Sequence, residues 1–241
     1  MPRDSEAADQ NVQELAHDLR NLLTCIRGYG EDSLRRDLLP LQRHAQLLRL
    51  IALVDRCALL VGALQGSAAD SGEVSVAEDV ADFAIEAHQP LFRAKGIRLE
   101  RRGDTGPTFV AAGAQTTLRI LHNLLANALK FTPKGGAVTV NIEAAPLSCR
   151  IEVEDTGSGM TAEQLERAFQ PFYQGAPSEP HSRGLGLAIA KGLAVGAGGA
   201  IEARSEGPGL GAAVSVRLPL YSCSLGSRGI GVPTRCASAH A

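Results

Sequence analysis

Apolar residues in the first quarter of the chain recur at alternating steps of four and three. This spacing holds from residue 7 to 34, and a run from residue 47 to 61 keeps the same rhythm. In the first run the repeating positions are Leu15, Leu19, Leu22, Ile26 and Tyr29. Heptad spacing predicts two amphipathic helices, and the breaker that ends at Pro40 predicts the turn between them. We therefore expect an N-terminal antiparallel helical hairpin.

Two helices of this length cannot bury their broad apolar stripes on one another alone. Pairing two hairpins as a four-helix bundle removes the problem, so the pattern predicts a homodimer. The alternative is a hairpin that packs on the second domain of its own chain. The short run of small and polar residues at 67–72 predicts a flexible linker after the hairpin.

Beyond residue 72 the pattern changes to alternating strands and helices. Period-two alternation and short apolar runs predict strands at 73–76, 96–101, 137–144, 148–154, 200–205 and 212–218. Helical spacing predicts helices at 77–95, 114–131 and 184–197. This order favours a two-layer α/β sandwich with helices on one face of a mixed sheet.

The predicted fold class of the whole chain is therefore α+β, with two domains. The hairpin occupies residues 1–66, the linker 67–72 and the α/β sandwich 73–220. Residues 221–241 have scattered Gly and Ser and no apolar period, which predicts a disordered tail.

Composition narrows the classes of partner. The formal net charge is −2, from 24 basic and 26 acidic residues, so no polybasic field indicates nucleic acid. No run approaches the roughly 20 apolar residues of a membrane span, and the start is not a signal peptide, which favours a cytoplasmic location. The five cysteines lack metal-site spacing and are expected to be reduced thiols.

The first candidate for chemistry is a histidine on the predicted hairpin. With Leu15 and Leu19 on the apolar seam, His17 projects away from it, Asn21 follows one turn later and Asp18 is adjacent. A neutral imidazole is a good nucleophile, and a carboxylate that accepts its Nδ1 proton leaves Nε2 free to attack. The alternative is an ordinary solvated histidine beside a surface acid.

A polar stripe marks the helix predicted at 114–131. Asn123, Asn127 and Lys130 share one face of this otherwise apolar helix. Amides that face a core are costly unless they meet a polar ligand. A carbonyl oxygen suits Mg²⁺ and an ammonium suits phosphate, so Asn127 and Lys130 indicate a site for a phosphorylated ligand.

Two glycine motifs extend this candidate site. Asp155 ends a predicted strand before Gly157 and Gly159, which permit a tight turn and the close approach of a planar base. A buried carboxylate accepts a hydrogen bond from an exocyclic amino group, which favours adenine.

The second motif is the run of Gly184, Leu185 and Gly186. It opens a helix whose bare amides suit phosphate oxygens. Between the two glycine motifs, the segment that contains Phe169 and Phe172 is expected to form a mobile lid.

In this order the motifs resemble the transmitter module of bacterial sensor histidine kinases, over about residues 15–219. That family joins a dimeric phosphoacceptor hairpin to an ATP-binding domain of the type shared with gyrase and Hsp90-like chaperones. The resemblance covers five motifs: the histidine box (His17, Asp18, Asn21), the asparagine box (Asn123, Asn127, Lys130), the first glycine box (Asp155, Gly157, Gly159), the phenylalanine box (Phe169, Phe172) and the second glycine box (Gly184, Gly186).

The resemblance implies a function and its cofactors. His17 would be phosphorylated from Mg-ATP, with Mg²⁺ held by Asn127 and adenine recognised by Asp155, and the phosphoryl group would pass to an aspartate of a response regulator receiver domain. Asn21 is suited to orient water for the reverse, phosphatase reaction. Only about 14 residues precede the seam, so the upstream sensor is expected to be a separate protein, the short N-terminus or a segment outside this chain.

The chain departs from the family pattern at three places. Leu22 stands where proline is usual, which predicts a straighter helix. Ser182 and Arg183 replace a glycine and a small hydroxyl residue, which stiffens the lid hinge and places the Arg183 cation near the phosphates. Gly113 stands where a polar residue is usual.

Two other functions are compatible with parts of the sequence. One is a catalytically weak phosphotransfer or scaffold protein with a vestigial ATP domain, against which the intact Asn127 and Asp155 motifs argue. The other is a nucleotide-driven clamp of the gyrase or chaperone type, which has no need for a hairpin that carries His17.

Overall fold

The computed structural model describes residues 73–103, 106–171, 173 and 184–221, together with a few positions between residues 23 and 54. The helical hairpin, the linker and the tail after residue 221 stay predictions, because they lie almost wholly outside the described residues. The same holds for five predicted site residues, which are His17, Asp18, Asn21, Phe172 and Arg183.

The described part of the chain is built on a five-stranded mixed sheet. Its strands are β2 (Arg98–Arg102), β4 (Ala137–Ala144), β5 (Ser148–Asp155), β6 (Ala200–Arg204) and β7 (Ala212–Pro219). The order across the sheet is β2-β4-β5-β7-β6. The pair β2 and β4 is parallel, and the other three pairs are antiparallel. A second, two-stranded sheet joins β1 (Ser75–Val76) to β3 (Phe109–Val110).

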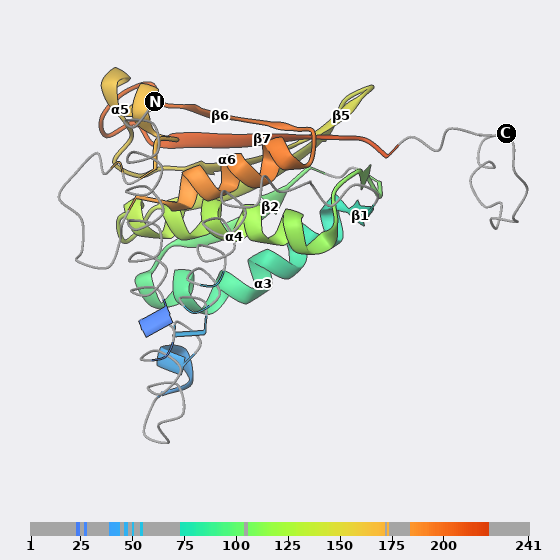
Figure 1. Ribbon diagram of the computed structural model, residues 1–241. Coiled ribbons are helices and arrows are strands. Elements are labelled where there is room, and N and C mark those ends of the chain that lie inside the picture. Colours follow the sequence, from blue (N-terminus) through green and yellow to red (C-terminus); the bar gives the residue numbers. More distant parts are fainter. Residues whose placement is uncertain are drawn as a thin grey trace, which may run out of the picture.

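Three helices lie together on one face of the large sheet (Figure 1). They are α3 (Ala77–Lys95), α4 (Ala114–Phe131) and α6 (Gly186–Gly196), and a short helix, α5 (Ala162–Arg167), lies near the end of β5. Helix α4 packs between α3 and α6. The predicted two-layer architecture with a mixed sheet is therefore confirmed.

The bounds of the long elements agree with the sequence pattern. Helices α3 and α4 begin and end at the predicted residues, and α3 stops at Gly96, whose φ of 72° is a left-handed C-cap. Two short elements were not predicted, β3 and α5. Strand β3 has only two residues and α5 only six, which is too short for either period to be visible.

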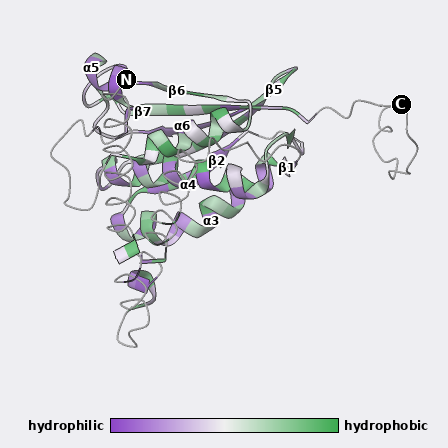
Figure 2. Ribbon diagram, viewed as in Figure 1, coloured by the Kyte–Doolittle hydropathy of each residue, from purple (hydrophilic) through white to green (hydrophobic). Residues whose placement is uncertain are grey.

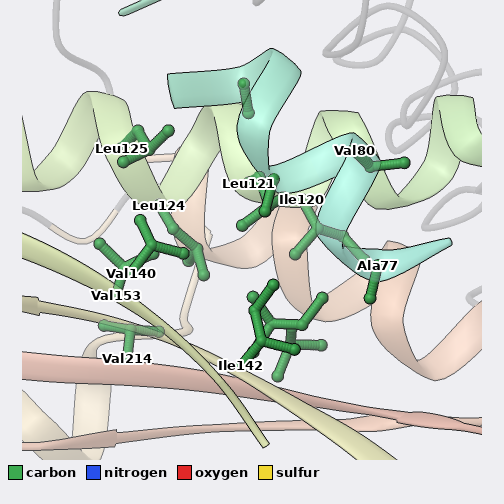
Figure 3. Close-up of a cluster of buried hydrophobic side chains, with 14 of the residues drawn as sticks. Ala77, Val80, Ile120, Leu121, Leu124, Leu125, Val140, Ile142, Val153 and Val214 are labelled. Atoms are coloured by element: carbon green, nitrogen blue, oxygen red, sulfur yellow. The ribbon is translucent and has the colours of Figure 1, made fainter. Parts of the chain in front are cut away.

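The helix-covered face of the sheet holds the core. Alternate residues of β5, at Cys149, Ile151 and Val153, are buried against the helices, and Leu121 and Leu124 of α4 meet them from the other side (Figure 3). Figure 2 shows hydrophobic and hydrophilic positions mixed along α3 and α4, as amphipathic helices require. Full burial of each large aliphatic side chain contributes about 1.5–3 kcal/mol to folding.

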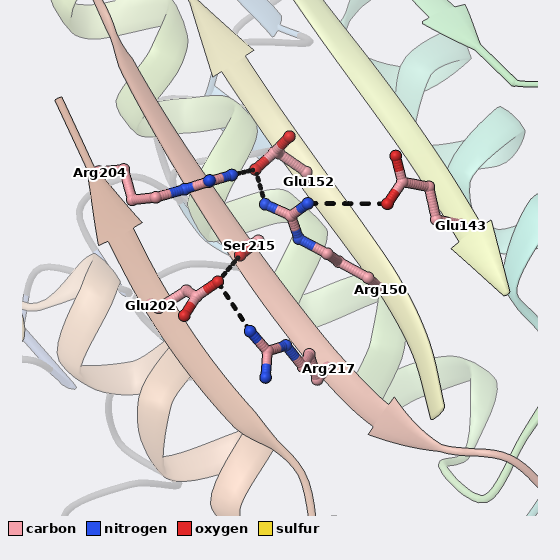
Figure 4. A network of polar contacts seen from close by, with 7 residues as sticks. All are labelled: Glu143, Arg150, Glu152, Glu202, Arg204, Ser215 and Arg217. Atoms are coloured by element: carbon pink, nitrogen blue, oxygen red, sulfur yellow. Dashed lines mark hydrogen bonds and ion pairs between the residues drawn. The ribbon is translucent and has the colours of Figure 1, made fainter. Parts of the chain in front are cut away.

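The opposite face of the sheet is charged. Glu152 on β5 binds Arg150 and Arg204, and Glu202 on β6 accepts hydrogen bonds from Ser215 and Arg217 of β7 (Figure 4). These side chains come from the residues of each strand that alternate with the core positions. The described strands therefore present one dry and one solvated face.

Among the described residues, no helix is both long enough and apolar enough to cross a membrane.

Candidate functional site

The two asparagines of α4 meet the first residue of α6. Asn123 is buried and Asn127 half-buried. A β-carbon added at Gly186 would lie 3.3 Å from the Oδ1 of Asn123 and 3.7 Å from the Oδ1 of Asn127. Glycine at this position therefore lets the start of α6 approach both amide oxygens closely.

The orientation of Asn123 is fixed by its own helix. Its Nδ2 donates a hydrogen bond of 2.8 Å to the carbonyl of Arg119, so its Oδ1 is the atom turned toward Gly186. Asn123 is thereby satisfied on its amide side without any ligand. Asn127, less buried, is the asparagine of the pair that a ligand reaches more readily.

The first turn of α6 is the counterpart of this amide pair. It carries no acidic residue, and Leu185, which precedes the helix, is buried and anchors it to the domain. Gly184 has a φ of 65°, a left-handed conformation that suits glycine. Bare amides and the positive end of the helix dipole thus lie beside the Asn123 and Asn127 oxygens, an arrangement that suits a metal-bound phosphate.

Asp155 lies at the end of β5, on the same side of the strand as the core positions. Its Oδ1 accepts a 2.8 Å hydrogen bond from the Gly157 amide, and the Ala212 amide also donates to the carboxyl. Burial raises the pKa of Asp155 above its ordinary value, although both hydrogen bonds oppose the shift. The carboxylate is thus oriented by backbone donors in a partly dry site.

The glycine turn after Asp155 is packed against other backbone. A β-carbon at Gly157 would lie 2.6 Å from the Asp155 Oδ1 and 2.6 Å from the carbonyl of Phe131. A β-carbon at Gly159, whose φ is 62°, would lie 2.1 Å from the carbonyl of Gly207. Any side chain at either position would displace the turn, which explains both glycines before any ligand is considered.

The turn is fastened to the C-terminal end of α4 and to the start of β4. The Ser158 amide donates to the carbonyl of Phe131 at 3.2 Å. The Thr156 amide donates to the Ala137 carbonyl at 3.0 Å, and the Ala137 amide donates to the Thr156 Oγ1 at 2.9 Å. Helix α4 therefore links the two parts of the candidate site, and Asn123 and Phe131 lie about 12 Å apart along its axis.

A loop that the sequence did not single out completes this end of the site. Residues 205–211, between β6 and β7, lie against the glycine turn. The Gly209 amide donates to the Ser158 carbonyl at 2.7 Å, and the Gly211 amide donates to the Gly157 carbonyl at 3.1 Å. Three glycines within five residues, at 207, 209 and 211, are the signal by which this loop was detectable.

Lys130 and Phe169 lie next to elements that form the site. The Lys130 Nζ is 4.6 Å from the centroid of the Phe131 ring, near the glycine turn that Phe131 supports. Phe169 is half-buried against the core, with the Lys191 Nζ 5.8 Å from its ring centroid. The second phenylalanine of the motif and the arginine before Gly184 lie outside the described residues.

The described side chains suit a metal ion that binds together with a phosphorylated ligand. No group of three His, Cys, Asp or Glu side chains that could hold a metal ion occurs among the described residues. Mg²⁺ in nucleotide sites is commonly held by one or two protein oxygens together with phosphate oxygens and water. The Asn127 amide oxygen fits that limited role.

Known proteins match this domain and the region before it. Residues 113–222 match the family of histidine kinase-, DNA gyrase B- and HSP90-like ATPases. Over 87% of its length the chain is 34% identical to the histidine protein kinase DivJ of Caulobacter vibrioides. The chain therefore contains an ATPase domain of this family and is similar over most of its length to a histidine kinase. The recognition made from the five sequence motifs is therefore confirmed.

Two solved structures resemble this chain, and they match different shares of its length. The mycobacterial sensor histidine kinase MprB, 28% identical, matches 61% of this chain and 98% of its own with a TM-score of 0.54. Full-length ShkA in complex with AMPPNP, 25% identical, matches 88% of this chain and 46% of its own with a TM-score of 0.63. These curated relatives are longer proteins, since the chain spans 37% of DivJ and 27% of a second Caulobacter vibrioides relative, the non-motile and phage-resistance protein.

Proposed function

We propose that this chain binds Mg-ATP in the site along α4 and transfers the γ-phosphoryl group to His17. The observation that carries the proposal is the convergence of two groups of residues along α4. The amide oxygens of Asn123 and Asn127 meet the N-terminus of α6, and the Asp155 turn lies against Phe131. The phosphate-binding part and the base-binding part of the site are thereby built along one helix.

Recognition of adenine is assigned to Asp155. Its carboxylate accepts a hydrogen bond from the exocyclic amino group of adenine, whereas guanine presents a carbonyl at the corresponding position. Two backbone donors hold the carboxylate in place before the base arrives, so little ordering is required on binding. The AMPPNP bound in the ShkA complex supports a site of this kind.

Phosphate and metal are assigned to the part of α4 around Asn123 and Asn127, which faces the start of α6. The amides of the first turn of α6 neutralise the phosphates. Lys130, in the last turn of α4, and Arg183 each add a cation. Asn127 would hold Mg²⁺, which would supply charge neutralisation to the phosphates when bound. The protein's own contribution is to position the γ-phosphorus for in-line attack.

The acceptor is assigned to His17 on the predicted hairpin. Its Nε2 attacks the γ-phosphorus, a P–N bond forms, and the bond to the bridging oxygen breaks so that ADP leaves with the electron pair. The Asp18 carboxylate accepts a hydrogen bond from the Nδ1–H group of His17 and stabilises the imidazolium that develops. The phosphoryl group then passes from nitrogen to a carboxylate oxygen of a response regulator, and Asn21 orients water in the phosphatase direction.

The hairpin is also assigned the dimer interface, and an upstream sensor supplies the signal, either as a separate protein, from the short N-terminus or from a segment outside this chain. Because the linker at 67–72 joins the two domains, catalysis requires the ATP domain to reach His17. Regulation is therefore expected to act on that motion rather than on the chemistry.

The test is incubation of the full chain with γ-labelled ATP. We expect acid-labile label on the wild type, none on a His17→Ala variant and wild-type labelling of a His44→Ala control, which removes another histidine from the same region. Label that persists in His17→Ala contradicts the assignment of the acceptor. ATP binding without any labelling favours the phosphotransfer or scaffold alternative.

A further inference from the structure

The loop at residues 205–211 is organised around one side chain. The Ser205 hydroxyl has one proton and two lone pairs. It donates to the Gly211 carbonyl at 2.6 Å, and it accepts from the Met160 amide at 3.0 Å and the Gly207 amide at 3.3 Å. A single half-buried hydroxyl thus joins both ends of the loop to the residue that follows the glycine turn.

The same loop is packed against the end of β5 at Asp155. A β-carbon at Gly211, whose φ is 74°, would lie 2.0 Å from the Asp155 carbonyl, so the loop and the strand end are in close backbone contact. The next residue, Ala212, supplies one of the two amides that hold the Asp155 carboxyl. A shift of the loop therefore moves a hydrogen-bond donor of the base-recognising carboxylate.

We propose that Ser205 is a positioning residue for base recognition, because its hydroxyl locks residues 205–211 onto the glycine turn and so fixes the orientation of Asp155. This inference rests on the proposed ATP site. Ser205 acts through Gly211 and Met160 rather than by contact with the nucleotide. Loss of the hydroxyl leaves the Met160 amide without this acceptor and lets the turn and the Ala212 amide shift together.

The strand next to the loop offers a matched control. The Ser215 hydroxyl also makes a hydrogen bond, which it donates to Glu202 at 3.2 Å on the charged face of the sheet. Ser205→Ala and Ser215→Ala therefore remove the same atom from neighbouring parts of the same domain. Of these two serines, only Ser205 makes a hydrogen bond to the residue that follows the glycine turn. Ser205→Thr keeps the hydroxyl and serves as the conservative variant.

The experiment is calorimetric titration of the full chain and these variants with AMPPNP and with the corresponding guanine nucleotide. We expect Ser205→Ala to weaken AMPPNP binding about tenfold, the size of a lost hydrogen bond to a buried partner. The preference for adenine over guanine is expected to fall with it. Ser205→Thr and Ser215→Ala are expected to keep both the wild-type affinity and the wild-type preference.

The outcomes separate this inference from the function on which it rests. Wild-type binding and preference in Ser205→Ala overturn the role of Ser205 and leave the ATP site standing. Equal weakening in Ser205→Ala and Ser215→Ala, with an unchanged base preference, indicates a general loss of stability and also overturns it. Absence of AMPPNP binding by the wild type overturns the proposed function itself, and the inference with it.

Discussion

The two faces of the central sheet use the same strands in opposite ways. On β5, Ile151 and Val153 point into a dry core beneath α4, whereas Arg150 and Glu152 join an ion-pair network on the other side (Figures 3 and 4). Strand alternation alone produces this division. The covered face is held by burial and the open face by solvated charge, and the candidate site belongs to the covered face.

Two carboxyl groups show what the difference does to chemistry. Asp155 continues the buried series of β5, and burial raises its pKa despite two backbone hydrogen bonds. Glu202 lies on the open face, where desolvation is outweighed by hydrogen bonds from Ser215 and Arg217, and its pKa is lowered. A carboxylate on the covered face is thus kept available for a ligand, whereas one on the open face is used to join strands.

The largest expected effect is the loss of stability when a core side chain of the covered face is removed. Ile151→Ala removes a fully buried side chain between the sheet and the helices, and such truncations cost about 2–5 kcal/mol. Chemical denaturation followed by circular dichroism measures the change. The matched control is Leu147→Ala in the hairpin between β4 and β5, where the side chain is 85% exposed and the cost is expected to stay below about 0.5 kcal/mol. Equal losses from the two variants contradict the assignment of the core.

The elements that the sequence predicted well are those specified by local pattern. Helix α3 has an acidic first turn and ends at Gly96, so both of its ends carry local signals, whereas α4 was predicted from its apolar period. Strand β3 has no such signal, since its two residues are a strand only because they pair with β1, more than 30 residues earlier. Local patterns cannot show a pairing at that distance.

The candidate site divides in the same way. Asp155 and its two glycines were identified from a short motif, and the asparagine stripe from helical spacing. The role of Ser205 depends on its contact with Met160, 45 residues away, which only the fold reveals. Gly113 has no explanation in the sequence or in the structure, because the nearest atom to a β-carbon there is the end of the exposed Glu73 side chain, which is free to move aside.

A smaller effect is expected from Asp155, and it depends on pH. Because its folded-state pKa is raised, the native state binds the proton more tightly than the unfolded chain does. The associated stability is fully present below the ordinary carboxyl pKa and is lost as pH rises through the raised value. We therefore expect the ligand-free wild type to lose stability relative to Asp155→Asn as pH rises across that window, measured by denaturation at several pH values.

The same substitution is expected to act in the opposite direction on nucleotide binding. Asp155→Asn replaces the carboxylate that accepts from adenine, and loss of a hydrogen bond to a charged group weakens AMPPNP binding about 10–100-fold. A variant that binds AMPPNP as tightly as the wild type contradicts the assignment of Asp155. A pH-independent difference in stability between the two proteins shows instead that burial does not shift this carboxyl.

The smallest effect is expected on the open face. The Arg217 guanidinium lies 3.1 Å from Glu202, and both side chains are close to half exposed, so a double-mutant cycle of Arg217→Ala and Glu202→Ala should give a coupling of about 0.2–1 kcal/mol. Salt should reduce this coupling, because exposed charges are screened. As pH falls through the lowered pKa of Glu202, the coupling should also be lost. A coupling as large as the cost of Ile151→Ala, or one that resists salt, would mean that the open face contributes to stability as the core does, and the division between the two faces would fail.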